Sequence, residues 1–337
     1  MVTIIAVVTV AVGFIFAFIN GFHDGCNVLA SSISSRSILP KQAMLIACAA
    51  EFIGALILGT AVAETIGRGV VYPSNVLAEE PVIGIIFVLS TLLGGIIWNL
   101  VTWKYGIPSS SSHALIGGIL GSGIFLFGWH SINWTNILFR VVIVMFTSPI
   151  IGFSIGYFFI KLAILLLKNS TTDVNDHLKK VQHYSMFFLG VSHGSSDSQK
   201  SMGLIALVLL VLNGGSEFHI PLWVKLGCAA AITAGLSIGG WKIIKTVGDK
   251  IYKLKPIHSF SSQIAASSVI AAASIFGSPV STTQIVISSV MGVGAGDRYK
   301  KVNWNTVKSI ATAWLTTLPS AAAISALLAF IMKIIFN

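Results

Sequence analysis

A short polar sequence occurs twice in this chain within otherwise apolar surroundings, and each copy carries one aspartate. The first copy, GFHDGCN, spans 21–27, and the second, GSSDSQK, spans 194–200. Aligning Asp24 with Asp197 also places Asn27 over Lys200, one helical turn after each aspartate. A carboxylate inside an apolar, membrane-spanning segment is costly and by default functional, so we expect both aspartates to contact a ligand. The alternative is that each one only caps a following half-helix.

Two runs of hydroxyl side chains form a second candidate group. They lie in GIPSSSSH (106–113) and GSPVSTTQ (277–284), each shortly after a proline. The hydroxyl residues that we expect to bind a ligand are Ser110, Ser111, Ser112, Ser281, Thr282 and Thr283. A helix start offers about four unpaired N–H groups and the positive end of the helix dipole, which together attract an oxyanion. One run alone would be read as a capped kink, but two runs at equivalent places favour an anion site.

The charges in these motifs conflict, and the conflict suggests a mechanism. Two carboxylates and a bound oxyanion repel one another, at about 4 kcal/mol for each like-charge pair 4 Å apart at an effective dielectric constant near 20. Lys200 is expected to pair with an aspartate, to contact the anion, or to do both in different states. The remaining repulsion calls for Na⁺ or H⁺ that enters with the anion, bound at or near Asp24 and Asp197.

Three further polar side chains have two interpretations each. Glu51, in the middle of an apolar segment, is either a cation ligand or a group that hydrogen-bonds neighbouring helices. His23 and Gln199 either contribute hydrogen bonds to the ligand or serve only the structure. We count Glu51 with Asp24 and Asp197 among the residues that couple a cation to the anion.

The composition restricts the protein to the integral membrane class. Of 337 residues 55% are hydrophobic and 9% are charged, the mean hydropathy is +0.88, and soluble domains carry about 25% charged residues. The net charge of +10 lies in short loops between apolar segments, so it indicates topology rather than nucleic-acid binding. We expect no cofactor and no nucleic-acid partner. Residues 2–20 lack a basic segment before them, so a cleaved signal peptide is not expected.

The two motif pairs belong to a longer internal duplication. A third pair, Asn133-Trp134 over Asn303-Trp304, recurs in the same order at a similar spacing of about 170 residues. The expected apolar spans of the first half are 2–36, 42–63, 82–105, 110–128 and 136–167. Those of the second half are 184–213, 221–241, 257–277, 281–296 and 303–335. The polar motif should interrupt the first helix of each half, and the third and fourth spans should form a helical hairpin, either re-entrant or spanning.

Loop charges predict that the two halves are inverted in the membrane. The loop 242–256 and the segment 298–301 are rich in Lys and Arg, whereas their counterparts 64–80 and 121–135 hold one basic residue and the acids Glu64, Glu79 and Glu80. The basic loop 36–41 likewise has a counterpart near Glu217 without Lys or Arg. Under the positive-inside rule, equivalent loops face opposite sides. We therefore expect an all-α polytopic membrane protein with a first repeat 1–167, a cytoplasmic linker 168–183, an inverted repeat 184–337, and both termini extracytoplasmic.

At these motifs the sequence resembles the inorganic phosphate transporter (PiT) family. That family carries two signatures like G-x-x-D-x-x-N and H-G-x-N-D-x-Q-K-x-M-G and two P-x-S-[ST]-[ST]-[HQ] runs. They stand here as GFHDGCNVLASS, SHGSSDSQKSMG, GIPSSSSHALIGG and GSPVSTTQIVISS, and the resemblance covers almost the whole chain. Ser196 departs from the pattern, because the family usually has Asn there, and we expect a weaker or altered contact at this position. The forms GFHD and SSSSH look more like those of bacterial low-affinity carriers.

The resemblance implies a secondary transporter of inorganic phosphate, driven by Na⁺ or H⁺, in the plasma membrane. It also implies a homodimer surrounded by membrane lipid, and substrate contacts at Asp24, Asn27, Asp197, Lys200 and the two hydroxyl runs. Two other transport activities remain open: symport of another tetrahedral oxyanion such as sulfate, and an anion channel. A membrane hydrolase using Ser112 and His113, or Ser192 and His193, is disfavoured, because adjacent helical residues point to different faces.

Overall fold

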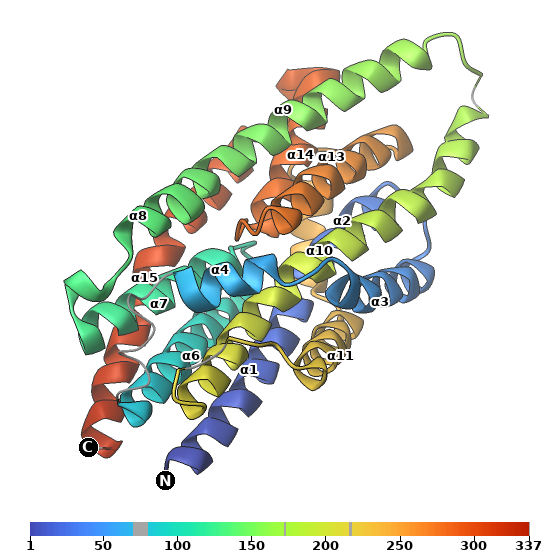
Figure 1. Ribbon diagram of the computed structural model, residues 1–337. Coiled ribbons are helices and arrows are strands. Elements are labelled where there is room, and N and C mark those ends of the chain that lie inside the picture. The colour runs from blue at the N-terminus through green and yellow to red at the C-terminus, as the bar shows by residue number, and fades with distance from the viewer. Residues whose placement is uncertain (70–79, 172, 216–217, 337) are drawn as a thin grey trace.

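The computed structural model describes residues 1–69, 80–171, 173–215 and 218–336, and within them the protein is helical without a β-strand (Figure 1). The main helices of the first part of the chain are α1 (Val2–Asp24), α2 (Cys26–Ser34), α3 (Pro40–Ile57), α4 (Ala61–Gly69), α6 (Pro81–Tyr105), α7 (Ser111–Phe127) and α9 (Ile143–Leu166). Those of the second part are α10 (Val174–Leu212), α11 (Leu222–Ile238), α12 (Trp241–Lys245), α13 (Pro256–Ile275), α14 (Thr282–Arg298) and α15 (Trp304–Phe336).

Short helical segments connect these helices. They are the 3₁₀ helices η1 (Trp129–Ser131) and η4 (Tyr299–Lys301), the short helix α8 (Trp134–Asn136), and the π-helical turns η2 (Ile137–Val142) and η3 (Thr246–Lys250). The sequence analysis treated 242–256 as a loop, but most of it is helical, and Ile243, Ile244 and Val247 are buried against neighbouring helices. The Glu79 and Glu217 positions used in the loop comparison lie outside the described residues.

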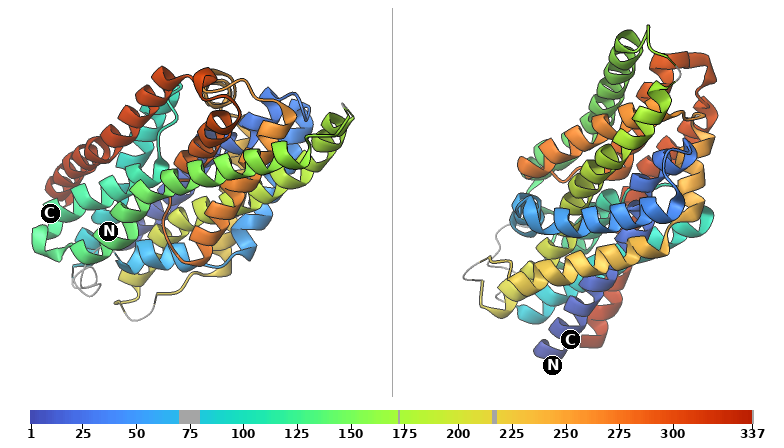
Figure 2. Two further views of the ribbon diagram at one scale, coloured as in Figure 1. Left: turned by 90° about the horizontal axis from the view of Figure 1, so that it is seen from above. Right: turned by 90° about the vertical axis from the view of Figure 1, so that its right-hand side faces the viewer.

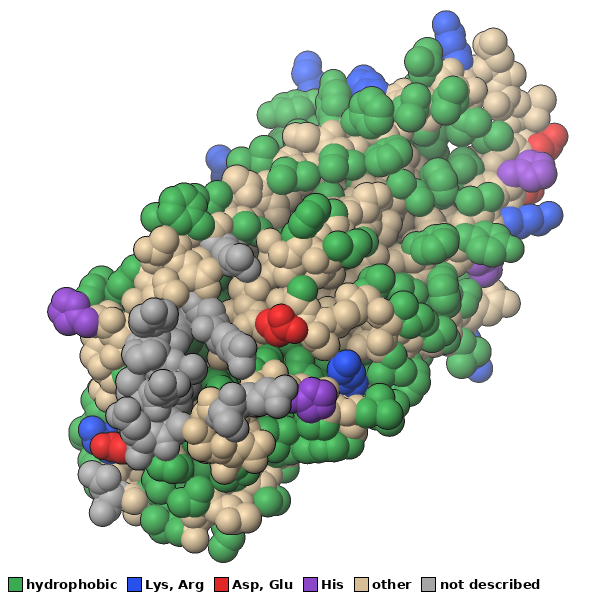
Figure 3. Space-filling view, in the orientation of Figure 1, with side chains coloured by type: hydrophobic (Ala, Val, Ile, Leu, Met, Phe, Trp, Pro, Cys, Tyr) green, Lys and Arg blue, Asp and Glu red, His purple; other side chains and the backbone are tan. Residues whose placement is uncertain are grey.

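Five helical segments of the described chain are long and apolar enough to cross a membrane. They are Val2–Ser34, Pro40–Ile57, Pro81–Tyr105, Trp134–Leu166 and Trp304–Phe336, and a sixth would be the pair Leu222–Ile238 and Trp241–Lys250, which is bent by 64°. Hydrophobic side chains cover much of the face in Figure 3, whereas most Lys and Arg side chains lie toward its upper and right-hand margins. The protein is an integral membrane protein.

The first helix of each half is not broken in the way that the sequence analysis predicted. Gly25 separates α1 from α2 but has helical dihedral angles (φ −59°, ψ −26°), and its N–H donates to the Gly21 carbonyl, so the interruption is slight. The second motif lies inside α10, a single helix of 39 residues. The prediction of a discontinuous helix at 194–200 is wrong. Gln199 of this motif bonds to the Val62 N–H of another helix, and α10 keeps its backbone helical through the motif.

The two predicted helical hairpins are present, and each has the same turn chemistry. In the first, α6 ends at Gly106 (φ 65°), and in the second the turn after α13 contains Gly277 (φ 67°). A left-handed glycine followed by a proline two residues later terminates a helix and redirects the chain, as Pro108 and Pro279 do here. The hydroxyl runs then start α7 and α14. Ser112 Oγ donates to the Val280 carbonyl at 2.8 Å, so the two hairpin tips touch each other.

Helices from the first and second parts of the chain are intertwined. The hairpin helix α7 packs against α15, and the hairpin helix α14 packs against α9. In the same way α3 packs against α10, and α1 against α11. Each half therefore completes its packing with helices of the other half, and the polar motifs of both halves meet in the interior.

The chain termini and the turn between α9 and α10 lie at different ends of the molecule (Figures 1 and 2). Both termini lie at the same end, close to the turn that follows α7, whereas the turn between α9 and α10 lies at the opposite end (Figures 1 and 2). The segment 168–183 contains that turn and the first residues of α10, which begins at Val174.

Close approach of α1 and α11 depends on two glycines, and this predicts their sensitivity to substitution. A methyl group at Gly21 would lie 1.9 Å from the Ile232 carbonyl oxygen, and one at Gly235 would lie 1.9 Å from the Phe18 carbonyl oxygen. Replacing either with alanine forces the helices apart, and we expect a loss of about 1–3 kcal/mol of stability in thermal unfolding of the detergent-solubilised protein. Ala11→Val, on the exposed side of α1, is the control and should unfold like the parent. An unchanged unfolding temperature for Gly21→Ala and Gly235→Ala would contradict the packing described.

Candidate functional site

Asp197 lies at the centre of a buried polar cluster to which four helices contribute. Its Oδ1 accepts from Lys200 Nζ at 2.7 Å and from Thr282 Oγ1 at 3.1 Å. Its Oδ2 accepts from Asn20 Nδ2 at 3.2 Å. Lys200 Nζ also donates to Ser111 Oγ, at 3.2 Å. α10 therefore supplies an ion pair whose remaining hydrogen bonds come from α1 and from the starts of α7 and α14.

Asp24 lies in an adjoining cluster that contains the equivalent residues of the first motif. Its Oδ1 accepts from Thr283 Oγ1 at 3.0 Å and lies 2.7 Å from His23 Nδ1. Thr283 Oγ1 in turn accepts from Asn27 Nδ2 at 2.9 Å. Because Thr282 binds Asp197 and Thr283 binds Asp24, the first turn of α14 joins the two aspartates.

The six hydroxyl residues of the two runs are all buried, and they have three kinds of contact, one of which is the Ser112 bond to the Val280 carbonyl between the hairpin tips. Ser110 and Ser281 are the N-caps of α7 and α14, and their hydroxyls accept from the N–H groups of His113 and Gln284. Their side chains therefore have the capping role that was the simpler interpretation. The hydroxyls that contact the charged groups are those of Ser111, Thr282 and Thr283.

Glu51 of α3 lies beside the second motif. His193 Nδ1 is 2.9 Å from Glu51 Oε1, and His193 Nε2 is 3.7 Å from Asp197 Oδ2, with all three side chains fully buried. Small residues allow this approach, because a methyl group at Gly194 would lie 2.4 Å from the Glu51 carbonyl oxygen. The imidazole of His193 thus connects the two carboxylates.

His23 and Gln199, for which a ligand contact and a structural role were both open, each contact another helix. His23 Nε2 lies 3.1 Å from Thr102 Oγ1, so the ring joins Asp24 to the end of α6 next to the tip of the first hairpin. Gln199 Oε1 accepts from the Val62 N–H at 2.8 Å and supplies a hydrogen bond to the start of α4. Gln199 therefore has a structural role.

Two residues of the site, Asn20 and His193, are not among the ligand contacts predicted from the motifs. His193 was considered only as half of a hydrolytic pair, and Asn20 was not considered. Each lies four residues before an aspartate, Asn20 before Asp24 and His193 before Asp197, and so on the same helical face. The two occupy equivalent places in the duplicated motifs. The signal for these two residues in the sequence was their position four residues before each aspartate, on the same helical face as the aspartate.

The arrangement suits an anion and a hard cation better than a transition metal. No group of three or more His, Cys, Asp or Glu able to hold a metal ion occurs in the described ranges. Three buried oxygens of the motif helices have no hydrogen-bond partner: Asn20 Oδ1 and Asn27 Oδ1, whose amide nitrogens donate to Asp197 and Thr283, and Ser196 Oγ. Neutral oxygens next to carboxylates are the ligands that hard cations take. Lys200, Asn27 and two helix starts offer donors to an anion at the same place.

Comparison with known proteins gives the family. Residues 20–325 match the model of the phosphate transporter family. The chain belongs to the phosphate transporter family. It is 40% identical over 335 residues to a probable low-affinity inorganic phosphate transporter of Bacillus subtilis, covering 99% of this chain and 98% of the relative. It is also 40% identical to a protein of the same description from Rhizobium meliloti, covering 95% of this chain and 94% of the relative.

A solved structure described as the sodium-dependent phosphate transporter has the same fold. Its TM-score to this chain is 0.88 at 28% sequence identity, covering 98% of this chain and 100% of the other. The family resemblance inferred from the motifs is confirmed, and the relatives are transporters rather than enzymes. The interpretation as a hydrolase is therefore dropped.

The buried pair Asp197–Lys200 predicts a strong dependence of stability on both partners. Lys200→Met leaves a buried carboxylate without its cation, and we expect a loss of about 3–5 kcal/mol of unfolding free energy. The double variant Asp197→Asn, Lys200→Met removes both charges and should recover part of that loss. The pair Asp176–Lys179 has the same spacing on the exposed start of α10, so Lys179→Met is a matched control and should change little. Equal effects of Lys200→Met and Lys179→Met in thermal unfolding would contradict this account.

Proposed function

We propose that this member of the phosphate transporter family imports inorganic phosphate by symport with a cation, through alternating access. The observation that carries the proposal is the meeting of two helix starts, α7 and α14, at two buried aspartates and one buried lysine. Ser111 contacts Lys200, Thr282 contacts Asp197, and Thr283 contacts Asp24. We therefore place the proposed phosphate site at the tips of the two hairpins.

Phosphate would displace interactions that the site now satisfies internally. Lys200 Nζ and the amide of Asn27 are donors at equivalent places in the two motifs, and the hydroxyls of Ser111, Thr282 and Thr283 surround them. Phosphate at neutral pH still carries protons, so its hydroxyl groups can donate hydrogen bonds to a carboxylate such as Asp24 or Asp197. Ser110, Ser112 and Ser281 shape the two helix starts, while the backbone N–H groups behind them attract the anion.

The cation offsets the repulsion between phosphate and the acids. Asp24, Asp197 and Glu51 lie in one buried region with the single lysine Lys200. The unpartnered oxygens of Asn20, Asn27 and Ser196 lie on the same helices and support Na⁺ as the companion ion. The description of the structural relative as sodium-dependent supports the same choice. A proton carried by Glu51, His193 and Asp197 is the alternative, because the imidazole lies between the two carboxylates.

The helix contacts between the two predicted repeats support the proposal of alternating access. The repeats 1–167 and 184–337, joined by 168–183, contribute equivalent pairs, α7 with α15 and α14 with α9. This pairing supports an inverted repeat whose two forms would expose the site to either side. The common end of the termini and the loop charges support extracytoplasmic termini in the plasma membrane. Association as a homodimer remains a prediction from the family resemblance.

Sulfate symport is the second candidate, since helix starts and hydroxyls bind either tetrahedral ion. Phosphate differs in carrying protons that a carboxylate can accept, and three buried carboxylates favour phosphate. A channel fits less well, because the side chains of the site are closed off by the protein and paired with one another.

Substitution of the aspartates tests the proposal. The purified protein is placed in liposomes, and uptake of labelled phosphate is measured under separately imposed Na⁺ and pH gradients, with and without excess sulfate. We expect saturable uptake driven by one gradient and resistant to sulfate. Asp24→Asn and Asp197→Asn should reduce it to background, while Asp176→Asn, on the exposed start of α10, should not. Near-normal uptake by the two site variants, with unchanged cation dependence, would refute the roles assigned to Asp24 and Asp197.

Glu51→Gln separates cation binding from phosphate binding. Removing this buried charge lowers cation affinity, and we expect the half-saturating cation concentration to rise about ten-fold, equivalent to about 1.4 kcal/mol. The phosphate concentration for half-maximal uptake at saturating cation should stay within about two-fold, because the first turns of α7 and α14 are unchanged. Glu64→Gln is the control, since Glu64 is exposed on α4. If Glu51→Gln altered only the phosphate dependence, Glu51 would belong with the substrate contacts instead.

A further inference from the structure

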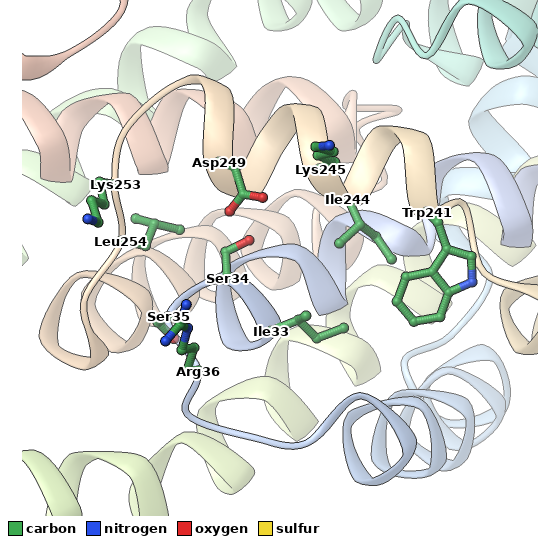
Figure 4. A pocket seen from close by; sticks show the side chains of 10 residues that line it. All are labelled: Ile33, Ser34, Ser35, Arg36, Trp241, Ile244, Lys245, Asp249, Lys253 and Leu254. Atoms are coloured by element: carbon green, nitrogen blue, oxygen red, sulfur yellow. The ribbon is translucent and has the colours of Figure 1, made fainter.

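A basic hollow lies at the far end of α2 from the site described above. It is formed by the end of α2 and the following turn on one side, and by α12, η3 and the next residues on the other. Its volume is about 870 Å³. Figure 4 shows Trp241 at one end and Lys253 at the other, with Lys245 and Asp249 between them and Arg36 on the facing segment.

The positive charges around this hollow are not neutralised by ion pairs. Arg36, Lys245 and Lys253 line it with one acid, Asp249. In the part of the chain that the structure describes, no ion pair within 4.0 Å involves any of these four residues. The neighbouring Lys242 differs, because it donates to the Lys104 carbonyl and lies over the Trp103 ring. The excess positive charge of the hollow therefore remains available to an anion.

Arg36 holds an unfavourable backbone conformation at this place. Its φ of 56° is the only positive φ of a non-glycine residue in the described chain. A left-handed residue just after a helix is normally glycine or asparagine, because a Cβ atom is strained there. Keeping an arginine directs a long cationic side chain to the rim of the hollow. Strained positions of this kind tend to mark binding sites.

The size and lining of the hollow indicate the class of ligand. The volume is in the range of sites for organic molecules and exceeds what a single inorganic ion needs. Half-exposed Trp241 and the buried side chains of Ile244 and Leu254 provide apolar wall next to the cations. We propose that this hollow is a binding site for a phosphate ester, with the phosphate near Arg36, Lys245 and Lys253 and the organic part against Trp241. Both a soluble nucleotide and an anionic phospholipid headgroup have this chemistry.

The ligand would contact two elements that are already packed tightly together. A methyl group at Gly248 in η3 would lie 1.9 Å from Ser34 Oγ at the end of α2. α2 begins beside Asn27 in the transport site and ends at Ser34 in the hollow. The binding proposal itself does not rest on the proposed transport activity.

The first experiment measures binding of a labelled nucleoside triphosphate to the full chain in discs of zwitterionic phosphatidylcholine, with saturating inorganic phosphate present. We expect saturable binding that the double variant Arg36→Gln, Lys245→Gln weakens at least ten-fold. Asp249→Asn should tighten it, because it removes the opposing charge. Lys250→Gln removes one positive charge from η3 outside the lining of the hollow, and its binding should stay within two-fold of the parent.

The second experiment identifies the source of the phosphate ester. Retention of phosphatidylglycerol over phosphatidylcholine is measured by native mass spectrometry on the same variants. Nucleotide binding that follows the variants assigns a soluble ligand, and lipid retention that follows them assigns a headgroup; either result supports the site. If neither depends on Arg36 and Lys245, the proposal is overturned. Asp197→Asn should keep nucleotide or lipid binding, so failure of transport and failure of this site are separately detected.

Discussion

The structure depends on keeping three carboxylates and one ammonium group away from water inside a membrane protein. Asp197 and Lys200 form an ion pair at 2.7 Å that is completely buried. Such a pair is stable only if its remaining hydrogen bonds are satisfied. Thr282, Asn20 and Ser111 supply them from three other helices, so the polar centre fixes how those helices meet.

The helices can meet there because small residues permit close contact. Glycines at 21 and 235 bring α1 against α11, and glycines at 54 and 194 bring α3 against α10. The second contact places Glu51 beside His193. In a bilayer, where apolar side chains gain little by leaving lipid, such close packing and buried polar contacts hold helices together. The same helix contacts therefore hold the protein together and position the polar side chains of the site.

Each half contributes an aspartate motif and a helix start to the site, but the two copies make different contacts. α7 and α14 both begin with a serine cap, yet α7 offers Ser111 to a lysine and α14 offers two threonines to two aspartates. Asn20 and His193 occupy equivalent places, and only His193 extends the network to Glu51. At the opposite end of α2, the cations around the basic hollow lie close to solvent, where no buried partner is required.

From the amino-acid sequence alone one can predict the membrane class, the family, the duplicated motifs and most of the charged and hydroxyl residues that meet in the interior. These follow from local composition, from the hydroxyl runs that come shortly after Pro108 and Pro279, and from the cost of polar groups in apolar segments. The continuity of α10 through the second motif, the capping role of Ser110 and Ser281, and the link from Glu51 through His193 to Asp197 were decided only by the tertiary structure. When two side chains lie 130 or more residues apart in the sequence, their contact depends on which helices pack together. No local pattern contains that information, because it arises from the packing of the whole chain.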